Sequence, residues 1–90
     1  MEIFLKGNYE TGEVWLNDNL LSPKRSLKVI NHSPDGFNWG YGGSGPAQLA
    51  LAICLELYDI VYAKEHYQDF KWKYISTLPQ SDFDVELDIE

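Results

Sequence analysis

The last nine residues alternate without exception between acidic and apolar side chains. The acidic set is Asp82, Asp84, Glu86, Asp88 and Glu90, and the apolar set is Phe83, Val85, Leu87 and Ile89. Because successive side chains of a β-strand point to opposite faces, the alternation predicts a half-buried strand over residues 82–90. Such a strand needs a sheet with one face packed on a core and the other in water, which is typical of antiparallel sheets.

Short runs that favour β-structure, separated by turn residues, fill the first part of the chain. We predict strands at residues 3–9 and 13–16, joined by a turn that ends at Gly12, and a third strand at residues 26–30. The segment Asn17-Asp18-Asn19 tolerates turn geometry and is predicted to close the second strand. The N-terminal half is therefore expected to be rich in hairpins.

Residues 33–42 carry a further turn and a candidate strand. The segment Ser33-Pro34-Asp35-Gly36 has the residues that a type I turn favours. Over residues 37–42, a period of two would place Phe37, Trp39 and Tyr41 on one face and almost bare backbone on the other. A helix or a ligand could approach that bare face closely.

Two helices are predicted next, over residues 46–58 and 60–78. Proline suits the first helical position, so the first helix is expected to start at Pro46 with Gly45 as its cap. From Ala47 to Leu55 it is apolar on every side except at Gln48, which predicts burial all round. The second has a one-sided apolar stripe and begins after Asp59, a residue type that caps helices. The pattern leaves open whether the two helices are continuous.

Together these elements predict an α+β fold. Its small antiparallel sheet combines the N-terminal hairpins with the C-terminal strand, and two helices pack on one face. A chain of 90 residues and 10.4 kDa fits a single domain over 1–90. The single cysteine, Cys54, excludes an internal disulfide. The longest apolar run, Leu49–Leu55, is far shorter than the ~20 residues that cross a bilayer, so we expect a cytoplasmic protein with no membrane association.

The net charge of −7 and the isoelectric point near 4.6 limit the partners of such a protein. A protein surface that binds nucleic acid is usually basic, so no direct nucleic-acid binding is expected. The only basic cluster is Lys24, Arg25 and Lys28. No catalytic residue, metal-ligand set or cofactor is predicted.

A glycine-rich loop before the first long helix is the main candidate site. Gly40, Gly42 and Gly45 have the G-x-G-x-x-G spacing, and backbone amides at a helix start can bind an anion. A dinucleotide-binding unit is disfavoured because it needs a second parallel strand, and the following region is helical. Alternatively, the same glycines could have only a structural role: they would allow a tight turn from strand to helix and close packing of the helix on the sheet.

In the ligand-binding interpretation, the loop holds the phosphate of a nucleotide-like small molecule. Its amides and the Ser44 hydroxyl would bind the anion, an aromatic ring would stack on the base, and two basic side chains would neutralise the charge. The residues assigned to this site are Lys24, Arg25, Trp39, Tyr41, Gly42, Gly43, Ser44 and Gly45. A remote alternative is a small hydrolase that uses Ser44, with His32 and Asp35 as candidate helpers.

The acidic row of residues 82–90 supports a different hypothesis. Its carboxylates could imitate a phosphate backbone and bind a basic groove of another protein, such as a host defence protein. Alternatively, the acidic row is only a solvated sheet face, whose charges keep an edge strand from aggregating. An exposed edge could also pair with a second copy into a homo-oligomer, although the carboxylates would then bring like charges together.

The loop and the helix after it carry a family resemblance. The run Phe37-x-Trp39-Gly40-Tyr41-Gly42-Gly43-Ser44-Gly45-Pro46-Ala47-Gln48-Leu49-Ala50-Leu51, with the preceding His32-Ser33-Pro34-Asp35-Gly36 and the later Ala63-x-x-x-Tyr67-Gln68-x-Phe70-Lys71, resembles a family of small prokaryotic and viral proteins of unknown function. The resemblance implies a stand-alone domain in viral and mobile-element settings, where small acidic proteins often inhibit host defence. It brings no activity or catalytic residues.

The sequence therefore predicts a non-enzymatic binding protein that takes an anionic, nucleotide-like ligand at the glycine-rich helix start. In a viral setting it would act in the host cytoplasm as an anti-defence factor that sequesters a signalling nucleotide. The alternative is an acidic inhibitor that binds a protein through its C-terminal carboxylates.

Overall fold

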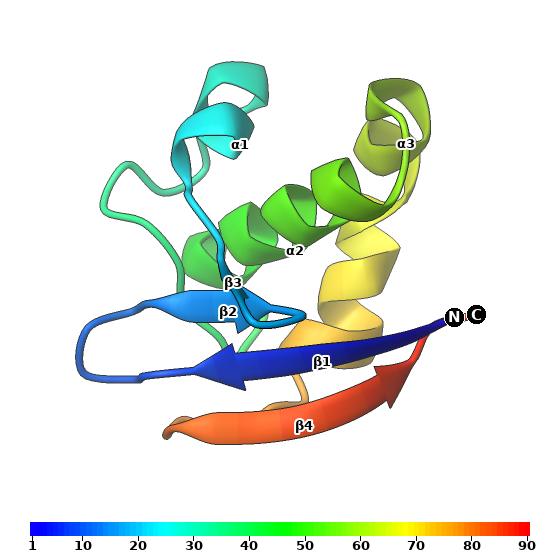
Figure 1. Cartoon of the computed structure of the whole chain (residues 1–90). Helices are drawn as coiled ribbons and strands as arrows, with labels where there is room; N and C mark the ends of the chain where they lie inside the picture. The colour runs from blue at the N-terminus through cyan, green and yellow to red at the C-terminus, as the bar shows by residue number, and fades with distance from the viewer.

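The computed structural model, which describes residues 1–90, has two layers: a four-stranded sheet and a layer of helices on one of its faces (Figure 1). The elements in chain order are β1 (Glu2–Gly7), β2 (Val14–Leu16), β3 (Asn19–Leu20), α1 (Lys24–Val29), α2 (Ser44–Leu57), α3 (Ile60–Phe70), the π-helical turn η1 (Lys71–Ile75) and β4 (Phe83–Asp88). The predicted α+β class and the antiparallel sheet are confirmed, with three helices in place of the expected two. None of these helices has the length and apolarity needed to span a bilayer.

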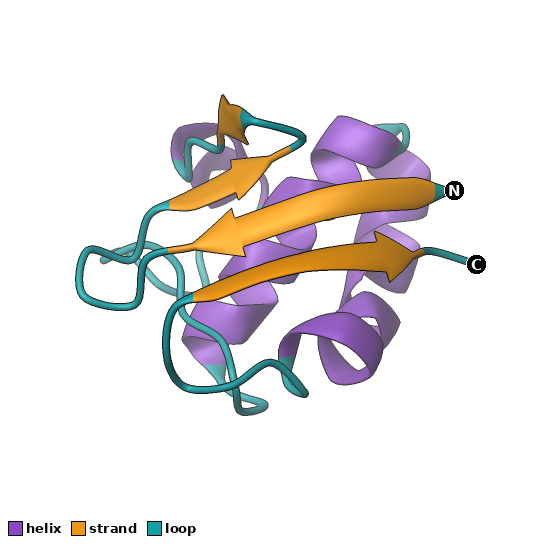
Figure 2. Ribbon diagram, turned by 60° about the horizontal axis from the view of Figure 1, so that its bottom comes forward, coloured by secondary structure: helices purple, strands orange, loops and turns teal.

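The sheet has the strand order β3-β2-β1-β4, and every neighbouring pair is antiparallel. Strand β4 lies at one edge and pairs along its whole length with β1, from Glu2 opposite Asp88 to Gly7 opposite Phe83. The predicted alternation is confirmed: Phe83 and Ile89 are buried, Val85 and Leu87 are half-buried, and all five carboxylates are exposed. Figure 2 shows the sheet from the side that the helices leave open.

Turn chemistry positions the hairpins as expected. Gly12 ends the β1–β2 turn with a φ of +76°, and its N–H donates to the Asn8 carbonyl oxygen at 2.8 Å. Asn17 and Asp18 both have positive φ between β2 and β3, as a tight hairpin turn requires. The type I turn at residues 33–36 forms, with the Gly36 N–H donating to the Ser33 carbonyl oxygen at 3.1 Å.

Helix α2 runs through the centre of the core. It begins at Ser44 with Gly43 as N-cap, two residues earlier than predicted, and every residue from Gly45 to Leu55 is buried. Helix α2 ends at Leu57, and Tyr58 after it is extended. The Asp59 carboxylate then caps α3 by accepting a hydrogen bond from the Tyr62 N–H at 2.9 Å. The two helices are therefore separate, and the regular part of the second ends at Phe70, before η1.

Two predicted strands are wrong. Residues 26–30 belong mostly to helix α1, in which the buried Ser26 side chain donates to the Pro23 carbonyl oxygen at 2.8 Å. Residues 37–42 form no strand, because Gly36 and Gly40 have φ values of +109° and +84° that break an extended path. The aromatic side chains of this segment consequently do not share one face: Trp39 is fully buried, whereas Tyr41 is exposed.

Candidate functional site

The glycine-rich loop is built by close packing against distant parts of the chain. Gly40 donates its N–H to the Ile75 carbonyl oxygen at 3.1 Å, and a Cβ there would lie 2.6 Å from Gln80 Cγ and 2.9 Å from the Leu78 carbonyl oxygen. Gly45 lies against Asn38 in the same way. Close packing is therefore sufficient to explain why Gly40 and Gly45 are glycines.

Side chains also cover the middle of the loop. The Trp72 ring lies against Gly42, and the Tyr41 ring lies against Gly43. The Lys71 ammonium donates to the Gly42 carbonyl oxygen at 3.3 Å. No acidic residue occupies the first turn of α2 and no side chain caps it, but no cavity opens at residues 40–48. The amides of this helix start have the right polarity for an anion, yet lack a pocket to hold one.

Trp39 is a correction to the predicted site, because its ring belongs to the core. The side chain is 0% exposed, and the indole Nε1–H donates to the Ser81 carbonyl oxygen at 2.9 Å. The ring packs edge-on against Phe83 and Tyr9, with centroids 4.9 and 5.6 Å apart. A ligand base cannot stack on it. Tyr41 remains 40% exposed.

The basic residues assigned to the loop lie at the other end of α2. The Arg25 guanidinium donates to the Leu55 carbonyl oxygen at 3.0 Å and lies 3.9 Å from the Glu56 carboxylate. Leu55 is eleven residues beyond Ser44, which corresponds to roughly 16 Å along a helix. The structure does not bring Lys24 and Arg25 together with the glycines in one site.

The residues considered for a hydrolase are not assembled either. The His32 imidazole Nε2 forms a 2.6 Å hydrogen bond with the Tyr67 hydroxyl, on the face of α3 that packs inward. The Ser44 hydroxyl has no hydrogen-bond partner. No general base lies within hydrogen-bonding reach of Ser44, as nucleophilic catalysis would require.

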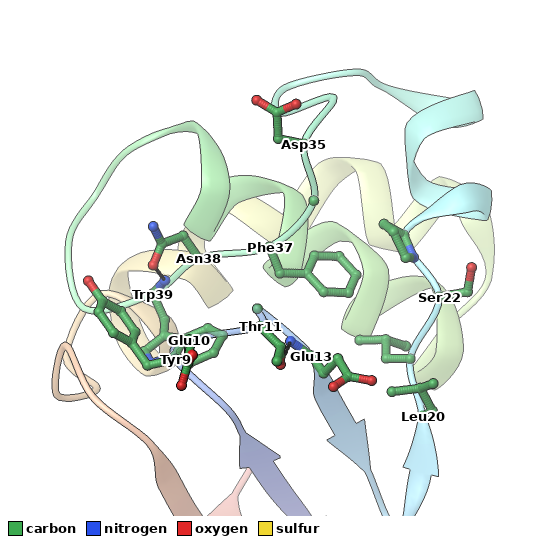
Figure 3. Close-up of a pocket in the computed structure, with 14 residues that line it drawn as sticks. Tyr9, Glu10, Thr11, Glu13, Leu20, Ser22, Asp35, Phe37, Asn38 and Trp39 are labelled. Atoms are coloured by element: carbon green, nitrogen blue, oxygen red, sulfur yellow. Dashed lines mark hydrogen bonds between the residues drawn. The ribbon is translucent and has the colours of Figure 1, made fainter.

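A cavity of about 500 Å³ lies between the β1–β2 turn, the segment after β3 and the loop at residues 35–39. In Figure 3 the Phe37 ring projects into it above Thr11 and Glu13, and Asp35 stands at the rim. The ionisable residues lining it are Glu10, Glu13, Asp35 and Tyr9, with no lysine or arginine. Its charge does not suit a phosphate.

The open face of the sheet is rich in acidic side chains. Its outward side chains come from three neighbouring strands: Glu2, Phe4 and Lys6 of β1, Trp15 of β2, and Asp84, Glu86 and Asp88 of β4. Phe4 is 56% exposed beside Glu86. The pKa of the Glu86 carboxyl is raised, chiefly by a hydrogen bond with the Glu2 side chain and then by the negative charge of Glu2.

The model of a family of unknown function, DUF6166, matches residues 5–89. The chain belongs to the DUF6166 family. The match includes the loop, the whole of α2 and the whole of β4, so the predicted membership of an uncharacterised family is confirmed. No curated protein and no solved structure matches the chain.

In this DUF6166 member, Gln48 has a structural role that its place in the sequence did not predict. Its side chain is 0% exposed, and the Oε1 atom accepts from the N–H groups of His32 and Ser33 at 2.7 and 3.1 Å. The Nε2 group donates to Ser26 Oγ and the Ile30 carbonyl oxygen at 2.9 and 3.1 Å. One buried amide thus ties α1 and the segment after it to α2. Gln48 is the single polar residue in the otherwise apolar run from Ala47 to Leu55, and that was the available signal.

Proposed function

We propose that this protein is a binding protein that holds a basic strand of a partner protein along β4, at the edge of its acidic sheet face. The observation that carries the proposal is the free outer edge of β4. Ile89 donates its N–H to the Met1 carbonyl oxygen, and the Met1 amine donates to the Ile89 carbonyl oxygen. Because antiparallel pairs alternate, Phe83, Val85 and Leu87 also face β1, whereas the backbone groups of Asp84, Glu86 and Asp88 point outward without partners.

The chemistry around this edge supports a partner with alternating side chains. On the open face, a fifth strand added beside β4 would meet the carboxylates of Asp84, Glu86 and Asp88, so lysine or arginine at every second position fits. On the helix side it would meet Val85 and Leu87, which are half-buried and would be covered by apolar residues at the intervening positions. Strand addition of this kind takes affinity from the backbone and specificity from alternate side chains.

The same charges argue against a second copy of this chain as the occupant. In an antiparallel pair centred on Glu86, the two Glu86 side chains would face each other, and Asp84 would face Asp88. Like charges directly opposite destabilise a strand pair. The edge therefore selects a basic strand and rejects its own.

A partner of this chemistry connects the proposal to inhibition. A protein that uses a basic strand or groove to hold nucleic acid would lose that surface when it pairs with β4. In the viral setting that the family resemblance implies, the partner would be a host defence protein and the chain an anti-defence inhibitor.

The test uses a short synthetic peptide with blocked ends that alternates lysine and valine. We expect it to bind, to protect the amides of Asp84, Glu86 and Asp88 from hydrogen exchange, and to bind more weakly as salt is added. A matched peptide that alternates glutamate and valine is the control for charge. Equal binding of both peptides would contradict the proposal.

Two substitutions at one position separate the edge from the charge. Glu86→Gln removes a carboxylate but keeps the outward N–H, whereas Glu86→Pro removes both and leaves the bonds to β1 intact, because proline is tolerated on edge strands. We expect Glu86→Pro to lower the affinity for the lysine–valine peptide about tenfold more than Glu86→Gln does, because it also removes a backbone hydrogen bond. Equal affinities of two folded variants would overturn strand addition.

A further inference from the structure

A second cavity, of about 610 Å³, shares Leu20, Leu21 and Ser22 with the one in Figure 3, but its lining is basic. Lys24, Arg25 and Lys28 line it, and Glu56 is its single acidic residue. The other cavities contain either no lysine or arginine, or one lysine and two carboxylates. In a chain of net charge −7, this cavity therefore concentrates three of the seven lysine and arginine residues.

Helix α1 and the end of α2 hold these cations in place. Lys24 and Lys28 are four residues apart, so they lie on the same face of α1. Arg25 is anchored by its hydrogen bond to the Leu55 carbonyl oxygen and by Glu56. A guanidinium has five N–H donors, so an anchored Arg25 still has donors for a ligand and loses little freedom on binding one.

The rest of the lining consists of four leucines, two asparagines and Ser22. Four leucines contribute the apolar wall: Leu16, Leu20, Leu21 and Leu57. Leu20 is 59% exposed and thus offers uncovered apolar surface. Asn17 and Asn19 face the cavity from the β2–β3 turn, and Asn17 uses its Oδ1 to accept from the Phe4 N–H, which leaves its amide N–H₂ to donate.

We infer that this cavity binds a small phosphate ester with an apolar or aromatic body. Three cations and one carboxylate leave two positive charges, which match a phosphate monoester near neutral pH. The leucine wall would cover the body of the ligand, and the volume lies within the range of about 300–1,000 Å³ for small-molecule sites. The site is independent of the strand edge, and it uses Lys24 and Arg25 without the glycine-rich loop.

The experiment compares three probes by amide chemical-shift changes in the NMR spectrum of the labelled protein: AMP, inorganic phosphate and adenosine. We expect AMP to bind more tightly than either half alone and to shift residues 16–28 and 56–57. Shifts confined to residues 43–45 would contradict the assignment and favour the helix start. Absence of any shift with AMP and with phosphate at millimolar concentration would overturn the site.

Charge variants complete the test. Lys24→Gln and Lys28→Gln together should lower the affinity for AMP by about tenfold or more, because each removes a charge-assisted contact. Lys6→Gln and Lys64→Gln together remove two exposed lysines outside this cavity; this double variant is the matched control and should leave the affinity unchanged. Equal losses in the two proteins would show that only the overall charge matters and would overturn the site. All of these side chains are exposed or half-buried, so the variants should fold, which their melting curves will verify.

Discussion

Asn38 and Gly45 lie so close together that no side chain fits between them. A Cβ at position 45 would lie 2.5 Å from Asn38 Cβ and 3.1 Å from the Asn38 backbone nitrogen. Backbone atoms cannot move aside as the end of a side chain can, so this contact alone requires glycine at the start of α2. The conspicuous spacing of glycines in the loop thus has a packing origin at this position.

The first prediction follows from that contact. Gly45→Ala should lower the free energy of unfolding by about 1–3 kcal/mol, because the added methyl group overpacks a buried site. Gly43→Ala is the matched comparison: its neighbour is the Tyr41 ring, which is 40% exposed and can swing away. Urea denaturation measures both. Equal losses at the two positions would contradict the packing explanation.

A second prediction concerns the buried amide of Gln48. Gln48→Leu should cost about 3 kcal/mol or more, because it leaves the N–H groups of His32 and Ser33 and the oxygen of Ile30 without partners. Gln68→Leu, at an exposed position whose amide reaches only the Tyr67 hydroxyl, should change stability by less than about 0.5 kcal/mol. Thermal unfolding of both variants checks the difference. A loss at position 48 no larger than that at position 68 would refute the role of the network.

The third prediction is a pH dependence at Glu86. Its pKa is raised in the folded protein by the hydrogen bond with Glu2 and the charge of Glu2, so the folded state holds this proton more tightly than the unfolded state. Stability contributed by the protonated carboxyl is therefore lost as pH rises through the raised pKa. Glu86→Gln should raise the melting temperature slightly at neutral pH, and the gain should vanish in acid.

Melting curves of the wild type and Glu86→Gln across a pH series measure this effect. Glu10→Gln, in the β1–β2 turn away from the open sheet face, is the control and should have no such profile. A gain at Glu86→Gln that grows toward acid pH would have the wrong sign and would rule out the explanation.

The fourth prediction concerns Cys54, which is 0% exposed in the middle of α2. Burial raises the pKa of its thiol to about 12, so the reactive thiolate is absent at neutral pH. A thiol reagent should leave the native protein unlabelled and should modify Cys54 rapidly in denaturant. Mass spectrometry measures the extent of labelling. Fast labelling of the native protein would mean that α2 opens readily.

The sequence allowed part of this structure to be predicted because some of its patterns are local. The acidic and apolar alternation of residues 82–90 has one geometric solution, a half-buried strand, and β4 is that strand. The apolar composition of residues 47–55 likewise specifies a buried helix, and Asp59 caps α3 as its side chain allows. In each case neighbours in sequence determine the result.

Other features depend on contacts that the sequence does not display. Residues 26–30 have β-favouring side chains, yet Ser26 forms part of the Gln48 network, and that tertiary contact holds them in α1. Trp39 resembled a stacking residue, but its indole fits between Tyr9 and Phe83, far away in the sequence. The separation of Arg25 from the glycines depends on which end of α2 meets α1, and no local pattern encodes it.

The pairing of β1 with β4 has a consequence for how the chain folds. Strand β1 finds its longest partner far along the sequence, since Glu2 lies opposite Asp88. Closing so long a loop costs entropy before the ladder of hydrogen bonds repays it, so this pairing is slow to form. We therefore expect the docking of β4 onto β1 to be a late step of folding.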